Sequence, residues 1–274
     1  LFTYHTIAEI KERAGGDPEP LVRKQAELRA STSADTVVTL SAEESNALEE
    51  FLGLPPSRSV TVPMGVDSAL FTRQSKSVAR AKLGIPADQS VALFVGRIES
   101  FKGPDILVRA IGKMQDRQDI RVLLVGGTEE EHSADWLGGI ADEEGVRDSL
   151  DWRHAVPQDE LPAFYSAADV CVIPSRHETF GLVALEAMAS GTPVVASDVG
   201  SLSSLVLEGE TGYLVRSGSP IDLARAVEDL LRNPTRAQRM GDAGAEWARR
   251  FSWNESAERL VAAYDSLAAM KQGQ

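Results

Sequence analysis

Two carboxylates stand eight residues apart in the stretch SRHETFGLVALEAMASGTPVVASDVG. Glu178 lies in a polar loop, and Glu186 lies inside a segment that is apolar on every side of a helical wheel. A helix apolar all round is buried, so we expect a buried helix after Phe180. A buried carboxylate is costly unless it is hydrogen-bonded or reaches a cleft. The spacing lets both carboxylates line one wall of a cleft, although burial alone favours a ligand role no more than a solvated carboxylate.

A second group of reactive residues is the segment GRIESFKG, in which Arg97 and Lys102 stand five residues apart. The segment follows an apolar strand predicted over 91–96 and precedes a predicted helix. A diphosphate needs cations, and arginine offers a fork while lysine offers a compact charge. Taken alone, such a pair is more often a solvated surface pair. The segment is neither a G-x-G-x-x-G loop nor a P-loop.

Together these motifs resemble the retaining family 4 glycosyltransferases of GT-B fold. The E-x7-E pattern implies that Glu178 faces the hydroxyls of a donor sugar and that Glu186 grips the ribose hydroxyls of its nucleotide. The G-R-x4-K-G pattern implies that Arg97 and Lys102 hold the diphosphate and stabilise the leaving nucleotide. The start of the buried helix offers free N–H groups that favour an anion. The further substrate-binding residues expected on this basis are Gly96, Thr179, Phe180, Gly181, Leu182 and Val183.

The resemblance also marks positions elsewhere in the chain. His5 ends a predicted strand, where a surface or capping histidine is usual, but the family places the histidine of its YHT or PHT motif beside the donor sugar. His5 is therefore a candidate catalytic residue. Met64 stands where the family has asparagine, and the segment 152–155 departs from the pattern that accepts the nucleobase. Ser201 replaces the second glycine of V-G-G-L, so we expect a modest local change there.

Strands and helices alternate along the chain from residue 78. Five apolar runs are predicted strands, at 91–96, 121–127, 150–156, 169–175 and 194–198, and 213–215 could add a sixth. Continuous apolar strands alternating with helices indicate a parallel sheet covered on both faces. Ligands of such sheets bind beyond the carboxyl ends of the strands, where Arg97 and Glu178 share one rim. The fold class is α/β, and the resemblance specifies GT-B, with two Rossmann-like parallel-sheet domains.

The chain divides into four predicted parts. Residues 1–62, with strands at 34–41 and 59–63, are interpreted as the remainder of an N-terminal acceptor-side domain whose first half is absent, so that domain is incomplete. Between those strands, a capping box of Ser41 and Glu44 predicts a helix over 42–52 that Gly53 ends. Residues 63–77 form a linker and 78–250 the nucleotide-sugar-binding domain. Residues 251–274 form a last helix, which the resemblance has crossing back to the first domain.

Composition narrows the class of function. The 274 residues are 43% hydrophobic with a net charge of −13, which argues against nucleic acid and anionic membranes as partners. The one cysteine, Cys171, lies in an apolar strand and is expected in the core. No apolar run is long enough for an integral membrane segment and no signal peptide is evident, so we expect a cytoplasmic protein. The four histidines are scattered and no Asp-x-Asp motif ends a strand, so no metal is expected.

These observations predict a glycosyltransferase of hexosyltransferase type. It would carry out retaining, metal-independent transfer of a sugar from a nucleotide-diphosphate sugar to an acceptor hydroxyl. The donor is a substrate, so no cofactor is implied. UDP is the first choice of nucleotide, since the YHT and E-x7-E segments look closest to enzymes of mycothiol and sucrose-phosphate type. The acceptor (a sugar, a polyol, a lipid-linked or a polysaccharide acceptor) is not specified. A nucleotide-sugar epimerase of the same fold and a non-catalytic nucleotide-binding module remain alternatives.

Overall fold

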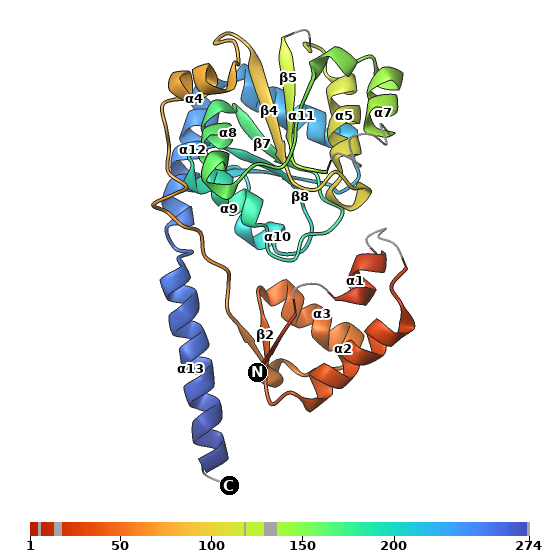
Figure 1. The fold of residues 1–274 in the computed structure, drawn as a ribbon, viewed down its shortest axis with the longest axis vertical. Coiled ribbons are helices and arrows are strands. Elements are labelled where there is room, and N and C mark those ends of the chain that lie inside the picture. Colours follow the sequence, from red (N-terminus) through yellow and green to blue (C-terminus); the bar gives the residue numbers. More distant parts are fainter. Residues whose placement is uncertain (5–6, 14–17, 118, 129–135, 273–274) are drawn as a thin grey trace.

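The computed structural model describes residues 1–4, 7–13, 18–117, 119–128 and 136–272. The chain forms a larger unit built on a six-stranded sheet and a smaller unit built on a three-stranded sheet (Figure 1). Every strand pair in both sheets is parallel. The α/β class and the alternation of strands and helices are therefore confirmed.

The larger unit contains all the strands predicted after residue 78. Its strands are β4 (Ser90–Val95), β5 (Ile120–Val125), β6 (Leu150–Arg153), β7 (Val170–Ile173), β8 (Val194–Ser197) and β9 (Gly212–Val215). Its helices are α4 (Lys76–Leu83), α5 (Pro104–Lys113), α7 (Trp136–Glu144), α8 (Leu161–Ala167), α9 (Leu182–Ala189), α10 (Leu202–Leu205), α11 (Pro220–Arg232) and α12 (Pro234–Ala248), with short 3₁₀ turns η2 (Ser100–Lys102), η3 (Arg147–Ser149) and η4 (Gln158–Glu160). The sixth strand proposed at 213–215 is present as β9.

Side chains of the central strands alternate between two cores. In β4, Val91 and Leu93 belong to one cluster, and Ala92 and Phe94 belong to the other. The first cluster lies under α4, α8 and α9, and the second lies under α5, α7 and α11. Because successive strand side chains point to opposite faces, apolar residues at every position require both faces to be covered.

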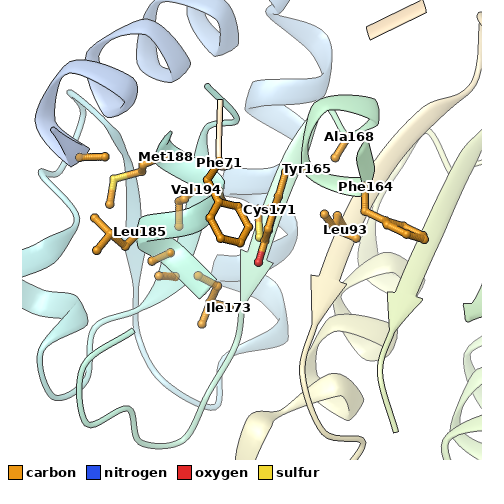
Figure 2. Packing of buried hydrophobic residues seen from close by; sticks show 14 of the residues in the cluster. Phe71, Leu93, Phe164, Tyr165, Ala168, Cys171, Ile173, Leu185, Met188 and Val194 are labelled. Carbon is orange, nitrogen blue, oxygen red and sulfur yellow. The ribbon is translucent and has the colours of Figure 1, made fainter. Parts of the chain in front are cut away.

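The first core contains the cysteine that the sequence placed in the interior. Figure 2 shows Cys171 with Phe71, Tyr165 and Met188 around it. The rings of Phe71 and Tyr165 meet edge to face, with centroids 6.0 Å apart. Cys171 is fully buried, and burial raises the pKa of its thiol well above the ordinary range. The prediction of a core residue rather than a nucleophile is confirmed.

The strand order of the larger sheet is β6-β5-β4-β7-β8-β9. The chain runs outward from β4 through β5 to β6, then returns to β7 beside β4 and runs outward the other way. The order therefore reverses between β4 and β7. In open parallel sheets this switch point leaves a crevice at the carboxyl ends of the two strands, and ligands bind there.

The smaller unit consists of a three-stranded sheet, β1-β2-β3, with helices packed on it. Its elements are β1 (Phe2–Thr3), α1 (Ala8–Arg13), α2 (Leu21–Ser33), β2 (Val37–Thr39), α3 (Ala42–Leu52), η1 (Pro56–Arg58) and β3 (Ser59–Thr61). Tyr4, Ile7, Val37, Leu48 and Leu54 form its core. Strands β2 and β3 are shorter than the predicted ranges.

Helix α3 begins and ends where the sequence predicts. Ser41 accepts a hydrogen bond from the Glu44 N–H at 3.1 Å, and Gly53 ends the helix at φ 64°. The capping box is not closed as expected, because the Glu44 carboxylate accepts from the N–H of Leu40, at 2.6 Å, instead of from that of Ser41. Only one oxygen of Glu44 takes part in this bond.

Two segments of the chain, residues 63–66 and residues 251–256, lie side by side where the two units are joined. The N–H of Val66 donates to the Phe251 carbonyl at 2.9 Å, and Ser256 Oγ donates to the Pro63 carbonyl at 2.6 Å. A Cβ at Gly65 would overlap the backbone of Trp253, so the segments meet without side chains between them. The domain boundaries at 62, 77 and 250 stay a prediction.

The last helix, α13 (Trp253–Gln272), leaves the larger unit and extends past the smaller one (Figure 1). Along this helix Val261 and Tyr264 are more than half exposed, and Ala263 is buried. None of the described helices has the length and apolar character needed to cross a membrane.

Some helices were not predicted. Helix α12 begins at Pro234, just after the end of α11. Proline is well suited to the first helical position, because its missing N–H has no partner there, so the same residue that stops one helix opens the next. Helices α2 and α4 were also missed.

Candidate active site

The loop after β4 carries the two predicted phosphate ligands. Gly96 closes the strand, and its N–H donates to the Val125 carbonyl at 3.0 Å. Lys102 ends the turn η2, and its Nζ lies 2.9 Å from Glu178 Oε2. Arg97 is two-thirds exposed and pairs with Glu99 at 2.8 Å. The structure therefore brings Lys102 to Glu178, while the Arg97 guanidinium pairs with a carboxylate of its own loop instead.

The loops after β4 and β7 are fixed against each other. A Cβ at Gly103 would overlap the Pro174 carbonyl oxygen, and Gly103 has a φ of 72°, so only glycine fits both demands. The Arg176 N–H donates to the Phe101 carbonyl at 2.9 Å, and the Arg176 guanidinium grips both oxygens of Asp105 at 2.7 and 3.0 Å. This fork-to-carboxylate pair sets the position of Glu178 relative to Lys102.

Glu178 and its neighbours line a pocket of about 150 Å³ between the two units. His177 and Thr179 line it from the same loop, and α3 lines it from the smaller unit. Burial lowers the pKa of His177 and Lys102 adds to this, although Glu178 opposes it. The His177 imidazole is therefore neutral at pH 7. Its ring meets that of Phe101 edge to face, with centroids 6.0 Å apart.

Helix α9 begins beside this pocket with free backbone donors. Gly181 precedes it at φ 93°, and no side chain caps the first turn. The N–H groups of Leu182 and Val183 stand in this uncapped turn, where the helix dipole favours an anion. The side chain of Phe180 is buried and packs against Phe251, so only its backbone is left for a ligand.

Glu186 is buried on the far part of α9, as the sequence predicts. Its Oε2 accepts from the Tyr165 hydroxyl at 2.7 Å, and its Oε1 accepts from Gln158 Nε2 at 3.4 Å. Burial raises the pKa of Glu186, against the two hydrogen bonds, which lower it. The side chain does not line the pocket that Glu178 lines. The two carboxylates therefore do not share that wall, because Glu186 turns toward α8.

The other predicted positions are His5, whose role was predicted from the family resemblance, and Ser201, where a local change was expected. His5 lies outside the described residues, so its role stays a prediction. Ser201 has φ −71° and ψ −13°, a helical conformation that any residue adopts, so no local change is needed to replace glycine there. Among the described residues, no three His, Cys, Asp or Glu side chains are grouped closely enough to hold a metal ion.

Comparison with known proteins agrees with this geometry. The family described as Glycosyl transferases group 1 matches residues 75–247, which is most of the chain. The chain belongs to that family.

Similarity to individual proteins supports this family assignment. The chain is 39% identical, over 97% of its length, to a D-inositol 3-phosphate glycosyltransferase of Nocardia farcinica, and 40% identical, over 96%, to one of Corynebacterium aurimucosum. It spans 61% and 65% of the length of these relatives. The fold is similar to that of a sucrose-phosphate synthase from Thermosynechococcus elongatus, with a TM-score of 0.90 and 32% identity over 98% of this chain and 67% of that one.

A more distant similarity supports the GT-B fold alone. The structure of Anabaena HepE in complex with UDP and glucose superposes with a TM-score of 0.85 at 21% identity, over 96% of this chain and 71% of that one. The GT-B architecture predicted from the motifs is confirmed by these matches.

Within this group 1 domain, the residues that hold the predicted ones in place were not predicted from the sequence. Tyr165 binds Glu186, and the pair of Arg176 and Asp105 fixes the loop of Glu178. Arg176 lies two residues before Glu178, which was the only available signal. Nothing in the apolar pattern of α8 distinguishes Tyr165 from its neighbours.

Proposed function

We propose that the chain transfers a sugar from a nucleotide-diphosphate sugar to an acceptor hydroxyl group, with retention of configuration and without a metal ion. The observation that carries this proposal is the meeting of Lys102, Glu178 and the uncapped start of α9 at the switch point of the larger sheet. A cation, a carboxylate and a set of backbone donors are the groups needed to hold a diphosphate next to a sugar.

The diphosphate would bind between Lys102 and the N–H groups of α9. Lys102 already has an anionic partner in Glu178, which keeps its ammonium directed into the crevice. A phosphate oxygen would join this pair, and Glu178 would keep an oxygen for a sugar hydroxyl. Arg97 is exposed and its ion pair with Glu99 lies at the surface, so it can turn to the second phosphate at small cost.

The reaction then follows from this placement. The bond between the anomeric carbon and the phosphate oxygen breaks, and its electron pair stays on the leaving diphosphate. The acceptor oxygen bonds to the same carbon on the same face, and its proton passes to the leaving phosphate. Charge builds up on that phosphate, so Arg97, Lys102 and the helix start would supply most of the rate effect by electrostatic stabilisation.

The nucleoside would bind farther along α9. Glu186 Oε1 has only a long contact with Gln158, so it can accept a hydrogen bond from a ribose hydroxyl. The Tyr165 hydroxyl bond fixes the other oxygen and orients the carboxyl group. Uracil is our choice of base because of the sequence resemblance to UDP-sugar enzymes. The relatives named above act on D-inositol 3-phosphate by name, so this compound is the first acceptor to test.

The test separates binding of phosphate from binding of nucleoside. Arg97→Ala and Lys102→Ala should each weaken UDP binding about ten- to a hundredfold, the size of a charge-assisted hydrogen bond, while leaving uridine binding unchanged. Lys82→Ala, which removes an exposed lysine of α4, is the matched control and should affect neither ligand. If the variants lost equal affinity for UDP and for uridine, Arg97 and Lys102 would not be phosphate ligands.

Turnover assays address the reaction itself. With UDP-glucose and D-inositol 3-phosphate, a glycosylated product should form and should persist in the presence of a chelator. A strict need for Mg²⁺ or Mn²⁺ would contradict metal-independent transfer. Conversion of the donor to its epimer without any acceptor would instead identify an epimerase.

A further inference from the structure

Arg176 spans the turn that carries Lys102. Its guanidinium donates to the Ser100 carbonyl, which lies before Lys102 in the chain. The same guanidinium donates to both oxygens of Asp105, which lies after Lys102, at 2.7 and 3.0 Å. In its own loop Arg176 comes shortly before Glu178, the partner of Lys102. One side chain therefore links the two backbone segments on which the members of the Lys102–Glu178 ion pair are carried.

The contact between Arg176 and Asp105 is arranged to last. Two parallel hydrogen bonds from a guanidinium to a carboxylate are the strongest geometry that such a pair adopts. The Arg176 side chain is 30% exposed and that of Asp105 is 13% exposed, so solvent ions screen this pair less than a surface pair. Asp105 also stands in the first turn of α5, where the helix dipole favours its negative charge. This link should persist when a ligand changes the charges in the crevice.

The pair of Lys102 and Glu178, in contrast, must weaken when a diphosphate binds. Among the described residues, Lys102 is the only basic side chain that is paired with Glu178. In the proposed complex a phosphate oxygen joins the Lys102 ammonium, so one cation is shared between two anions. The Glu178 carboxylate and the diphosphate then repel each other, and this repulsion is stronger in a crevice than in bulk water. Without a restraint, Glu178 would move away from the donor.

The other groups that line the pocket beside Glu178 supply no replacement cation. No lysine or arginine is found among the described residues of this lining. Glu43 and Glu44 line it from α3 and carry no positive charge, and the His177 imidazole is neutral at pH 7. The Glu178 carbonyl accepts one long hydrogen bond, at 3.3 Å, from the N–H of Ser201. The restraint on the loop must therefore come mainly from the side that Arg176 holds.

We propose that Arg176 is a positioning residue: through Asp105 it holds the Glu178 loop against the repulsion of a bound diphosphate and so keeps Glu178 within reach of the donor sugar. This role rests on the proposed transfer reaction and deepens it, because recognition of the sugar then depends on a pair that does not touch the sugar. Loss of the pair should relieve the repulsion felt by UDP. The same loss should deprive the sugar of its contact with Glu178.

The test compares the affinities of the whole chain for UDP and for UDP-glucose, measured by calorimetry. Arg176→Met should leave UDP binding unchanged or tighter. It should weaken UDP-glucose binding relative to UDP about tenfold, the size of one lost hydrogen bond to a charged group. Asp105→Asn should cause the same shift, and the double variant should cause no more than either single change, because both break one contact. Arg176→Lys, which keeps the charge but not the fork, should lie between the natural chain and Arg176→Met.

Two comparisons show whether Arg176 acts through Glu178. In a Glu178→Ala background the sugar contact is already absent, so adding Arg176→Met should leave the ratio of the two affinities unchanged. Arg236→Met is the matched control, because Arg236 contacts both oxygens of Asp229, at 2.7 Å each, where α11 and α12 meet. This control should leave both affinities unchanged.

A purely structural role predicts a different result. Arg176→Met removes an ion pair of the fold, so its melting temperature should fall in either case, and the ratio of affinities carries the test. Equal weakening of UDP and UDP-glucose, or the same shift in ratio with and without Glu178, would overturn the positioning role. If the natural chain bound UDP no more tightly than uridine, the proposed function would fail instead, and Arg176 would have no diphosphate to oppose.

Discussion

Glu44 gives the sharpest test of the electrostatics in the smaller unit. Its carboxyl group is almost completely buried, and burial raises its pKa from 4.5 to about 7, against the hydrogen bond from Leu40, which lowers it. Between those pH values the folded chain holds a proton that the unfolded chain has released. The free energy of unfolding therefore falls as the pH rises from 4.5 to 7. The full loss amounts to about 3 kcal/mol.

The perturbation is Glu44→Gln, whose amide oxygen can still accept from Leu40 and which carries no charge at any pH. The variant should not suffer this loss, part of which has already occurred at pH 5, so its stability relative to the natural chain should be about 2.5 kcal/mol more favourable at pH 8 than at pH 5. Glu186 also has a raised pKa, but it is present in both proteins and cancels in the comparison.

Hydrogen exchange of the amides in β2 and α3, followed by mass spectrometry at the two pH values, gives the free energy of opening of this unit. Glu49→Gln, on the exposed side of α3, is the control and should show no such pH dependence. A difference between Glu44→Gln and the natural chain that stays constant from pH 5 to 8 would refute the reasoning. It would mean that the Glu44 carboxylate is ionised and satisfied in the fold.

Three further predictions concern the larger unit. Glu186→Gln should weaken both UDP and uridine binding by about 1–3 kcal/mol without lowering the melting temperature, measured by calorimetry; a lower melting temperature with unchanged affinities would indicate a structural carboxylate. Gly103→Ala should destabilise the chain in urea unfolding far more than Gly84→Ala, because both glycines have φ near 70° but only a Cβ at Gly103 would overlap the Pro174 carbonyl; equal effects would show that the two loops can separate. Cys171 should resist alkylation at pH 8 until the chain is unfolded, since its thiol is buried and its pKa is raised; rapid labelling of the folded chain would contradict that burial.

The local pattern of the sequence determined the strands of the larger unit and the edge of its sheet at which the site lies. Apolar runs bounded by glycine and proline predict the strands, and parallel strands must end at one edge, so the sequence alone puts Arg97, Lys102 and Glu178 on the same edge of the sheet. The all-round apolar segment likewise gave the burial of Glu186. These properties depend on residues close together in the chain, which is why periodicity reveals them.

Tertiary structure decided which of these residues meet. The strand order puts β4 beside β7 and so brings Lys102 to Glu178, although β5 and β6 lie between them in the chain. The same packing pairs Tyr165 with Glu186 and turns that carboxylate away from the pocket. Periodicity describes one element at a time and carries no information about pairing across long separations. Whether a polar atom such as Ser201 Oγ lacks a partner depends on everything packed around it, and only the assembled fold shows that.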